Sequence, residues 1–159
     1  MSRLVIGLGF RDEASAQSIA EVLDMAAARA ALPGVARAIA VSDDKAAHRG
    51  LRAAAHAAMP GVASVIAVLE DKAAHPGLLA TAQATHLRIE TVAADAMRQV
   101  DVRVATRSER VEKHRGVGSV CEAAALAGAG PGARLVVTRM VSADRHATAA
   151  AAIIEDTAP

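Results

Sequence analysis

A tandem repeat in the first half of the chain constrains the fold more than any other feature of the sequence. Residues 33–59 and 60–86 align without a gap, and 17 of their 27 positions are identical. Each copy begins with Pro-Gly, continues through a short aliphatic run and an acidic-lysine loop, and ends in a stretch rich in Ala and Leu. This order predicts a strand, a loop and a helix, so the repeat is a duplicated βα unit. Two copies are too few for a solenoid, which favours an α/β domain with one extra unit.

The rest of the 159 residues continues the alternation of strands and helices. Apolar runs predict strands at residues 3–8, 87–92, 134–141 and 146–154. Helical spacing and end signals predict helices at residues 14–31, 93–99 and 119–127. The first of these is capped by Asp12 or Ser15, and the last is ended by Gly128. Pro76 begins the helix of the second repeat copy. Alternation of this kind places helices on both faces of a sheet. We therefore expect a single domain, 1–159, with a three-layer α/β/α architecture around a mainly parallel or mixed sheet.

Composition excludes several classes of function. The formal net charge is +1 and 1% of the residues are aromatic, so the chain lacks the phosphate affinity and the stacking surfaces of nucleic-acid-binding proteins. A single cysteine excludes an internal disulfide and a cysteine-rich zinc site, and the six histidines show no metal-ligand spacing. The first apolar run, 4–8, is too short for a signal peptide, and the longest mostly apolar stretch, 57–69, is interrupted by Pro60-Gly61. We expect a cytoplasmic protein without a metal, a cofactor, a nucleic-acid partner or a membrane partner.

The first candidate site is the segment 7–12, GLGFRD, between the first strand and the first helix. It begins like a dinucleotide-binding fingerprint, but Asp12 occupies the position of the third glycine. No acidic residue ends a second strand about 20 residues further on, where the ribose contact requires one. Gly7 and Gly9 therefore indicate a tight turn from strand to helix. Arg11 is a candidate for binding an anion, because open α/β sheets bind ligands at the carboxyl ends of their strands.

The second candidate site is the segment 116–122, GVGSVCE. Ser119 and Glu122 have the spacing of a capping box, which predicts Ser119 as the N-cap of the following helix. Gly116 and Gly118 allow close backbone approach, and free N–H groups at a helix start favour a carboxylate or a phosphate. A well-capped helix without a ligand is the alternative interpretation.

Cys121 lies in the first turn of the same predicted helix. The field of the helix lowers the pKa of a thiol at this position, as a nucleophile would need. The sequence fixes no His–Asp pair near it, so a small packed thiol is the favoured interpretation.

The third candidate site is the sequence Asp-Lys-Ala-Ala-His, which occurs in both copies of the repeat. It supplies Asp44, Lys45 and His48 in the first copy and Asp71, Lys72 and His75 in the second. Each segment follows a predicted strand, so the side chains belong to the ligand edge of the sheet. There Lys72 and His75 are candidates for binding carboxylates, and His75 is also a candidate proton carrier. The structural alternative is that His75 caps a helix and Lys72 points into water.

These segments resemble one known family. The Gly7-Leu-Gly9 segment with Arg11, the stretch KAAHPGLL at 72–79 and above all GVGSVCEAAAL at 116–126 are similar to CobE and the C-terminal domain of CbiG, a family of cobalamin biosynthesis. The resemblance covers nearly the whole chain and implies a part in building the corrin ring of vitamin B12. The ligand-binding residues that it implies at these loops and in the last pair of strands are Gly7, Gly9, Arg11, Lys72, His75, Gly116, Gly118, Ser119 and Arg139.

The sequence departs from the family pattern in three respects. Phe10 stands where the family often has Cys, and His75 stands where an acidic residue is common. The family has one lysine-containing βα unit, whereas this chain has two. The second copy carries the Pro and the Leu-Leu of the family, so residues 33–59 are the expected insertion.

The ligand that the resemblance implies is a corrin or precorrin intermediate. Such molecules carry several acetate and propionate carboxylates, which suit capped helix starts and Arg or Lys side chains. One predicted function is binding of such an intermediate. A second is hydrolysis of a precorrin lactone, as in CbiG, with Lys72, His75, Cys121 and Glu122 as candidate catalytic residues. A third is an interaction module that docks another enzyme of the pathway or a second copy of the chain, giving a homodimer.

Overall fold

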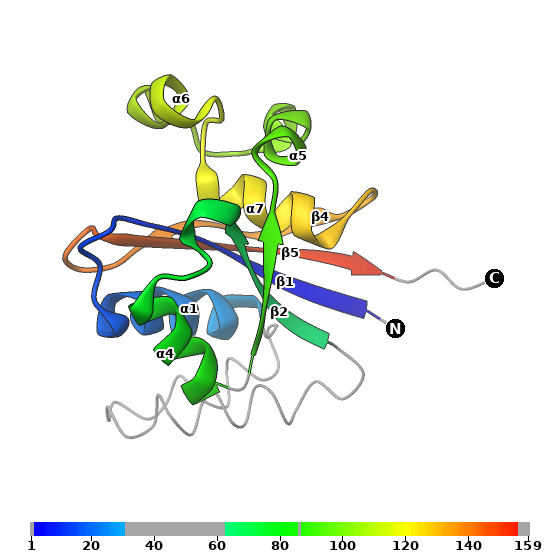
Figure 1. Ribbon diagram of the computed structural model, residues 1–159. Helices are drawn as coiled ribbons and strands as arrows, with labels where there is room; N and C mark the ends of the chain where they lie inside the picture. Colours follow the sequence, from blue (N-terminus) through cyan, green and yellow to red (C-terminus); the bar gives the residue numbers. More distant parts are fainter. Residues whose placement is uncertain (1, 31–62, 86, 156–159) are drawn as a thin grey trace.

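The computed structural model describes residues 2–30, 63–85 and 87–155 (Figure 1). The strands in these ranges are β1 (Ser2–Phe10), β2 (Ala63–Leu69), β3 (Arg88–Val92), β4 (Arg134–Val141) and β5 (Ala147–Glu155). The helices are α1 (Ala16–Ala30), α4 (Pro76–Thr85), α5 (Ala94–Gln99), α6 (Glu109–Arg115) and α7 (Val120–Ala129), with short 3-10 helices η1 (Glu70–Lys72) and η2 (Asp101–Arg103).

The strands form one mixed sheet in the order β3-β2-β1-β5-β4. β1, β2 and β3 are parallel, whereas β5 is antiparallel to both β1 and β4. Because Phe10, at the end of β1, pairs with Ala147, at the start of β5, the β4–β5 hairpin lies at the same edge as the carboxyl ends of β1 and β2. The predicted fold class is confirmed, and this edge is where the candidate loops emerge.

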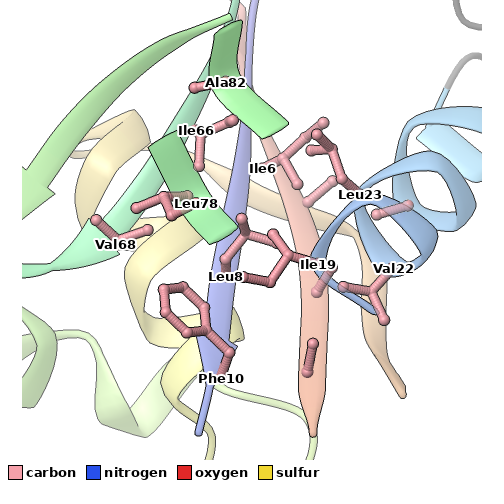
Figure 2. Packing of buried hydrophobic residues seen from close by; sticks show 14 of the residues in the cluster. Ile6, Leu8, Phe10, Ile19, Val22, Leu23, Ile66, Val68, Leu78 and Ala82 are labelled. Atoms are coloured by element: carbon pink, nitrogen blue, oxygen red, sulfur yellow. The ribbon is translucent and has the colours of Figure 1, made fainter. Parts of the chain in front are cut away.

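The core has two layers, one on each face of the sheet. On one face, Leu8 of β1 packs against Ile19 of α1 and Leu78 of α4 (Figure 2). α7 covers the other face, with α5 and α6 on the same side of the sheet (Figure 1). Full burial of such an aliphatic side chain contributes about 1.5–3 kcal/mol. Strand β5, between β1 and β4, carries fully buried alanines at 149–152, which lets helices approach closely from both sides.

Two glycines of β1 let α7 lie directly on the strand. A Cβ atom at Gly7 would lie 2.0 Å from the carbonyl oxygen of Cys121 and 2.5 Å from the nitrogen of Ala125. At Gly9 it would lie 2.9 Å from Oγ1 of Thr148. The predicted tight turn at these glycines is wrong, because β1 continues to Phe10. The absence of a side chain is needed for packing, not for a turn.

Most local signals predict their elements well. Ser15 caps α1 by accepting a hydrogen bond from the N–H of Ser18 at 3.1 Å, and Pro76 is the first residue of α4. The predicted end of α7 at Gly128 is wrong, because the helix continues to Ala129 and Gly130 follows it with a φ of 103°. Gly128 serves packing instead, since a Cβ there would lie 2.8 Å from the Cβ of Ala67 on β2.

The second copy of the repeat forms the predicted βα unit, with β2, η1 and α4 in succession. The first copy, residues 33–59 with Asp44, Lys45 and His48, lies outside the described residues. The single domain 1–159 and the duplicated unit therefore stay predictions. No helix in the described ranges is both long and apolar enough to cross a membrane.

Candidate functional site

The candidate residues fall into two charged clusters near the carboxyl edge of the parallel strands. We call the first the outer cluster; it consists of Asp12, Asp71, Lys72, His75 and Arg115. We call the second the inner cluster; it consists of Asp101, Arg107, Gly118, Ser119, Cys121 and Glu122. The outer cluster joins the loops after β1 and β2 to the end of α6, and the inner cluster surrounds the start of α7.

Lys72 is the best-shielded cation of the outer cluster. Its Nζ lies 2.5 Å from Oδ1 of Asp12 and 5.7 Å from the centroid of the Phe10 ring. The Lys72 side chain is 14% exposed, so the alternative in which it points into water is wrong. The hydrogen bond and the charge of Lys72, the charge of Arg115 and, when its ring is protonated, that of His75 hold the pKa of Asp12 below its usual value. These three cationic or potentially cationic groups therefore share one electrostatic environment.

His75 uses both ring nitrogens to shape the start of α4. Its Nδ1 accepts a hydrogen bond from the N–H of Gly77 at 3.1 Å, and its Nε2 lies 2.8 Å from the carbonyl oxygen of Asp12. An accepting nitrogen carries no proton, so this geometry requires the neutral ring with the proton on Nε2. The Phe10 ring packs against it with centroids 4.9 Å apart. The structural alternative for His75, a helix cap, is confirmed, and protonation of Nδ1 would remove that cap.

Arg115 completes the outer cluster from a different element. Its Nη1 lies 2.9 Å from Oδ2 of Asp71, which ties the last turn of α6 to η1. Gly116 follows with a φ of 74°, a left-handed conformation that ends α6. Arg115 was not among the residues predicted from the sequence, although basic residues just before a glycine are a visible signal of a helix end at this position. Arg11 lies next to Asp12 with a half-exposed side chain, 3.9 Å from Glu13.

Glu122 is the buried centre of the inner cluster. Its Oε1 accepts hydrogen bonds from the backbone N–H groups of Ala105 at 2.6 Å and Thr106 at 2.9 Å, and its Oε2 accepts one from Arg139 at 2.9 Å. Burial alone would raise the pKa of Glu122, but the hydrogen bonds from Thr106, Arg139 and Ala105 together lower it. This carboxylate therefore fixes the 105–106 loop and β4 against α7.

The predicted capping box is wrong in its contacts. Ser119 stands at the N-cap position of α7, but its side chain makes no capping hydrogen bond. Its hydroxyl lies 3.5 Å from Sγ of Cys121 instead. The three backbone donors around Glu122 hold that side chain away from the N–H of Ser119, so the reciprocal bond of a capping box does not form.

Cys121 is a buried free thiol. Burial raises its pKa, although hydrogen bonds with Ser119 and Thr148 act in the opposite direction. The lowering expected from the helix start is outweighed, because the thiolate would lose its hydration here. The prediction of a small packed thiol is confirmed.

Gly118 offers its backbone N–H to a carboxylate of the chain itself. The N–H donates to Oδ1 of Asp101 at 2.7 Å, and a Cβ at Gly118 would lie 3.0 Å from Cζ of Arg107. Hydrogen bonds from Arg107 and Gly118 lower the pKa of Asp101. The donor that the sequence offers to an external anion is thus bound by an internal one.

The structure therefore sorts the predicted site residues into four places. The outer cluster contains Lys72 and His75, with Arg11 beside them. The inner cluster contains Gly118, Ser119, Cys121 and Glu122, and Arg139 joins it through its backbone. Gly116 lies between the clusters, whereas Gly7 and Gly9 lie under α7. Among the described residues, no three His, Cys, Asp or Glu side chains are grouped as metal ligands. Roles of these residues in ligand binding or catalysis stay predictions.

A mixed open sheet with helices on both faces and charged loops at one edge defines an α/β domain that carries its candidate site beyond the carboxyl ends of its parallel strands. Residues 56–152 match the family model of the cobalamin synthesis G C-terminus, and the chain belongs to this family. The resemblance inferred from the sequence is confirmed, and the chain is a protein of cobalamin biosynthesis.

Two solved structures are similar to this chain. CobE, a protein from the cobalamin (vitamin B12) biosynthetic pathway, is 23% identical, with a TM-score of 0.68 over 97% of this chain and 92% of that chain. Cobalamin biosynthesis protein ChiG from Agrobacterium tumefaciens is 29% identical, with a TM-score of 0.55 over 96% of this chain and 99% of that chain. At its level of identity the likeness to CobE shows the fold alone. No curated protein is significantly similar in sequence.

Proposed function

We propose that this chain takes part in corrin-ring formation by binding a carboxylate-rich corrin or precorrin intermediate at the outer cluster. Membership in a cobalamin biosynthesis family narrows the ligand to the chemistry of that pathway. The observation that carries the proposal is the arrangement of Lys72 and Arg115, two cations from different elements that lie at the edge where β1 and β2 end, with Arg11 close by. Cations held in this way suit the acetate and propionate side chains of a corrin.

The state of the candidate catalytic residues favours binding over lactone hydrolysis. A general acid or base must exchange a proton with the substrate within hydrogen-bond reach. Cys121 is buried with a raised pKa, and Glu122 is buried with both oxygens bound to backbone N–H groups. Each nitrogen of His75 already has a partner in the protein. Of the four candidates, this leaves Lys72, whose ammonium group is already paired with a carboxylate, that of Asp12.

A visible-absorbance titration tests the proposal directly. The probe is a metal-free corrin with free carboxylic acid side chains, and the comparison probe is the same macrocycle with those groups converted to amides. The protein contributes no visible absorbance, so any band shift belongs to the probe. We expect a saturable shift with the acid and a much weaker one with the amide.

The variant Arg88→Gln serves as a matched control. Arg88 is 73% exposed at the amino end of β3, the opposite edge of the sheet, so its removal should leave the titration unchanged. Absence of a saturable shift with the acid probe would overturn the binding proposal. Turnover of an added lactone-containing precorrin by the same preparation would move the assignment to the hydrolase.

A further inference from the structure

In both ion pairs of the outer cluster the cation is better shielded from water than its carboxylate partner. The Lys72 side chain is 14% exposed and that of Asp12 is 90% exposed. The Arg115 side chain is 36% exposed and that of Asp71 is 55% exposed. The asymmetry means that the protein positions the cations, whereas the carboxylates reach them from the solvent side.

The cations are held by more than their partners. Lys72 is the last residue of η1 and lies over the Phe10 ring, which is itself packed against His75. Arg115 belongs to the last turn of α6, where Gly116 ends the helix by donating its N–H to the carbonyl oxygen of Glu112 at 2.9 Å. Departure of Asp12 or Asp71 would therefore leave each cation close to its present position. A partly desolvated ammonium or guanidinium group then binds a replacement carboxylate more strongly than a fully hydrated one would.

Separating either aspartate from its cation requires little free energy on the side of the aspartate. An exposed carboxylate regains full hydration when it separates from its partner, and exposed ion pairs are weak for this reason. The shielding of Lys72 gives the opposite result for the cation, which would lose a charge partner without gaining much water. Exchange of one carboxylate for another avoids that loss, because the cation stays paired throughout.

Building on the proposed function, we infer that Asp12 and Asp71 occupy the places of ligand carboxylates in the free protein. On binding, two acidic side chains of the corrin replace them on Lys72 and Arg115. The two aspartates thus act as built-in competitors, and the site recognises a ligand with at least two carboxylates. The ligand must bridge η1 and α6, because one cation comes from each element.

Substitutions that remove the charge of either partner of each ion pair test the exchange. The probe is again the metal-free corrin acid, titrated against wild type, Asp12→Asn, Asp71→Asn, Lys72→Gln and Arg115→Gln, with Arg88→Gln as the control. Loss of either cation should weaken binding about tenfold, as expected for one charge-assisted hydrogen bond. Loss of either aspartate should tighten binding about threefold, and the double aspartate variant should tighten it further.

The outcomes separate this inference from the proposal on which it rests. If wild type binds the acid probe but the aspartate variants bind it equally or more weakly, the exchange is wrong while the binding function stands. If wild type does not bind the probe, the binding function fails and the exchange fails with it. Urea unfolding of every variant shows which ones keep the fold. NMR titration of the Asp12 carboxyl gives an independent readout. Its pKa should rise toward the usual value when a carboxylate of the ligand replaces Asp12 as the partner of Lys72.

Discussion

The inner and outer clusters contain carboxylates whose pKa is lowered for different reasons. Glu122 is fully buried and surrounded by backbone N–H groups, which belong to fixed parts of the chain. Asp12 is almost fully exposed, and a lysine side chain is its main partner. A buried carboxylate without its donors would be very unfavourable, so the inner cluster determines the geometry of the edge. An exposed carboxylate can leave at little cost, so the outer cluster is where a ligand can compete.

Replacement of Glu122 should have the largest effect on stability. Glu122→Ala leaves the N–H groups of Ala105, Thr106 and Arg139 without their acceptor, and we expect a loss of about 3–5 kcal/mol in the free energy of unfolding. Urea denaturation followed by circular dichroism measures it. The control is Glu109→Ala, because Glu109 is exposed in the first turn of α6. A loss below about 1 kcal/mol for Glu122→Ala would mean that this carboxylate does not hold the loop and β4.

Gly7→Ala should be the next most damaging substitution. Its Cβ would lie 2.0 Å from a backbone carbonyl oxygen of α7, so strand and helix must move apart, and we expect a loss of about 3 kcal/mol. Gly9→Ala is the matched comparison, because its nearest contact is the hydroxyl of Thr148 at 2.9 Å, and it should cost about 1 kcal/mol. Equal losses in urea denaturation would contradict the packing interpretation of these glycines.

The same contrast explains which features could be predicted from the sequence. Elements whose signals are local were predicted well: β1 from its apolar run, α1 from its spacing and Ser15, and α4 from Pro76. The fold class followed from their alternation. The Asp-Lys-Ala-Ala-His segment of the second copy, at 71–75, was correctly placed at the carboxyl edge because it lies just after β2.

Contacts between distant segments could not be read from local patterns. Ser119 and Glu122 have capping-box spacing, but the sequence does not reveal that residues 105–106 and Arg139 bring three donors to Glu122. Gly128 resembles a helix end, but its role depends on Ala67 of β2, which lies far away in the chain. Arg115 was not predicted as a site residue, because its partner, Asp71, is 44 residues away in the sequence. Such features depend on tertiary packing, which overrides local preference.

Acidification should weaken the fold through Glu122. Its pKa in the folded state lies below the unfolded value of 4.5, so its contribution to stability is fully present above that pH. The contribution is lost as the pH falls through the lower, folded value. Between pH 7 and pH 3, the free energy of unfolding in urea should fall more steeply for wild type than for Glu122→Gln, because glutamine cannot ionise at this position. Parallel curves for the two proteins would contradict a lowered pKa for Glu122.

Substitution of His75 should have a smaller effect, confined to the start of α4. His75→Ala removes the acceptor for the N–H of Gly77, and we expect a loss of about 1 kcal/mol. His75→Asn should recover most of it, because Asn is a strong N-cap residue. Urea midpoints of the three proteins measure the difference. If Asn recovers nothing, the contribution of His75 comes from its contact with Phe10 and not from capping.

The smallest effect on stability is expected for the two aspartates of the outer cluster, and that result would sharpen the comparison most. Asp12→Asn and Asp71→Asn remove exposed partners of Lys72 and Arg115, and exposed pairs are further screened by salt. We expect urea midpoints within experimental error of wild type in 0.15 M salt, even though the same variants change the affinity for the corrin acid. A marked loss of stability would mean that these pairs hold α6 and the loop after β1 in place, as Glu122 holds β4. The outer cluster would then be a second structural anchor, and its carboxylates could not be released to a ligand without unfolding the edge.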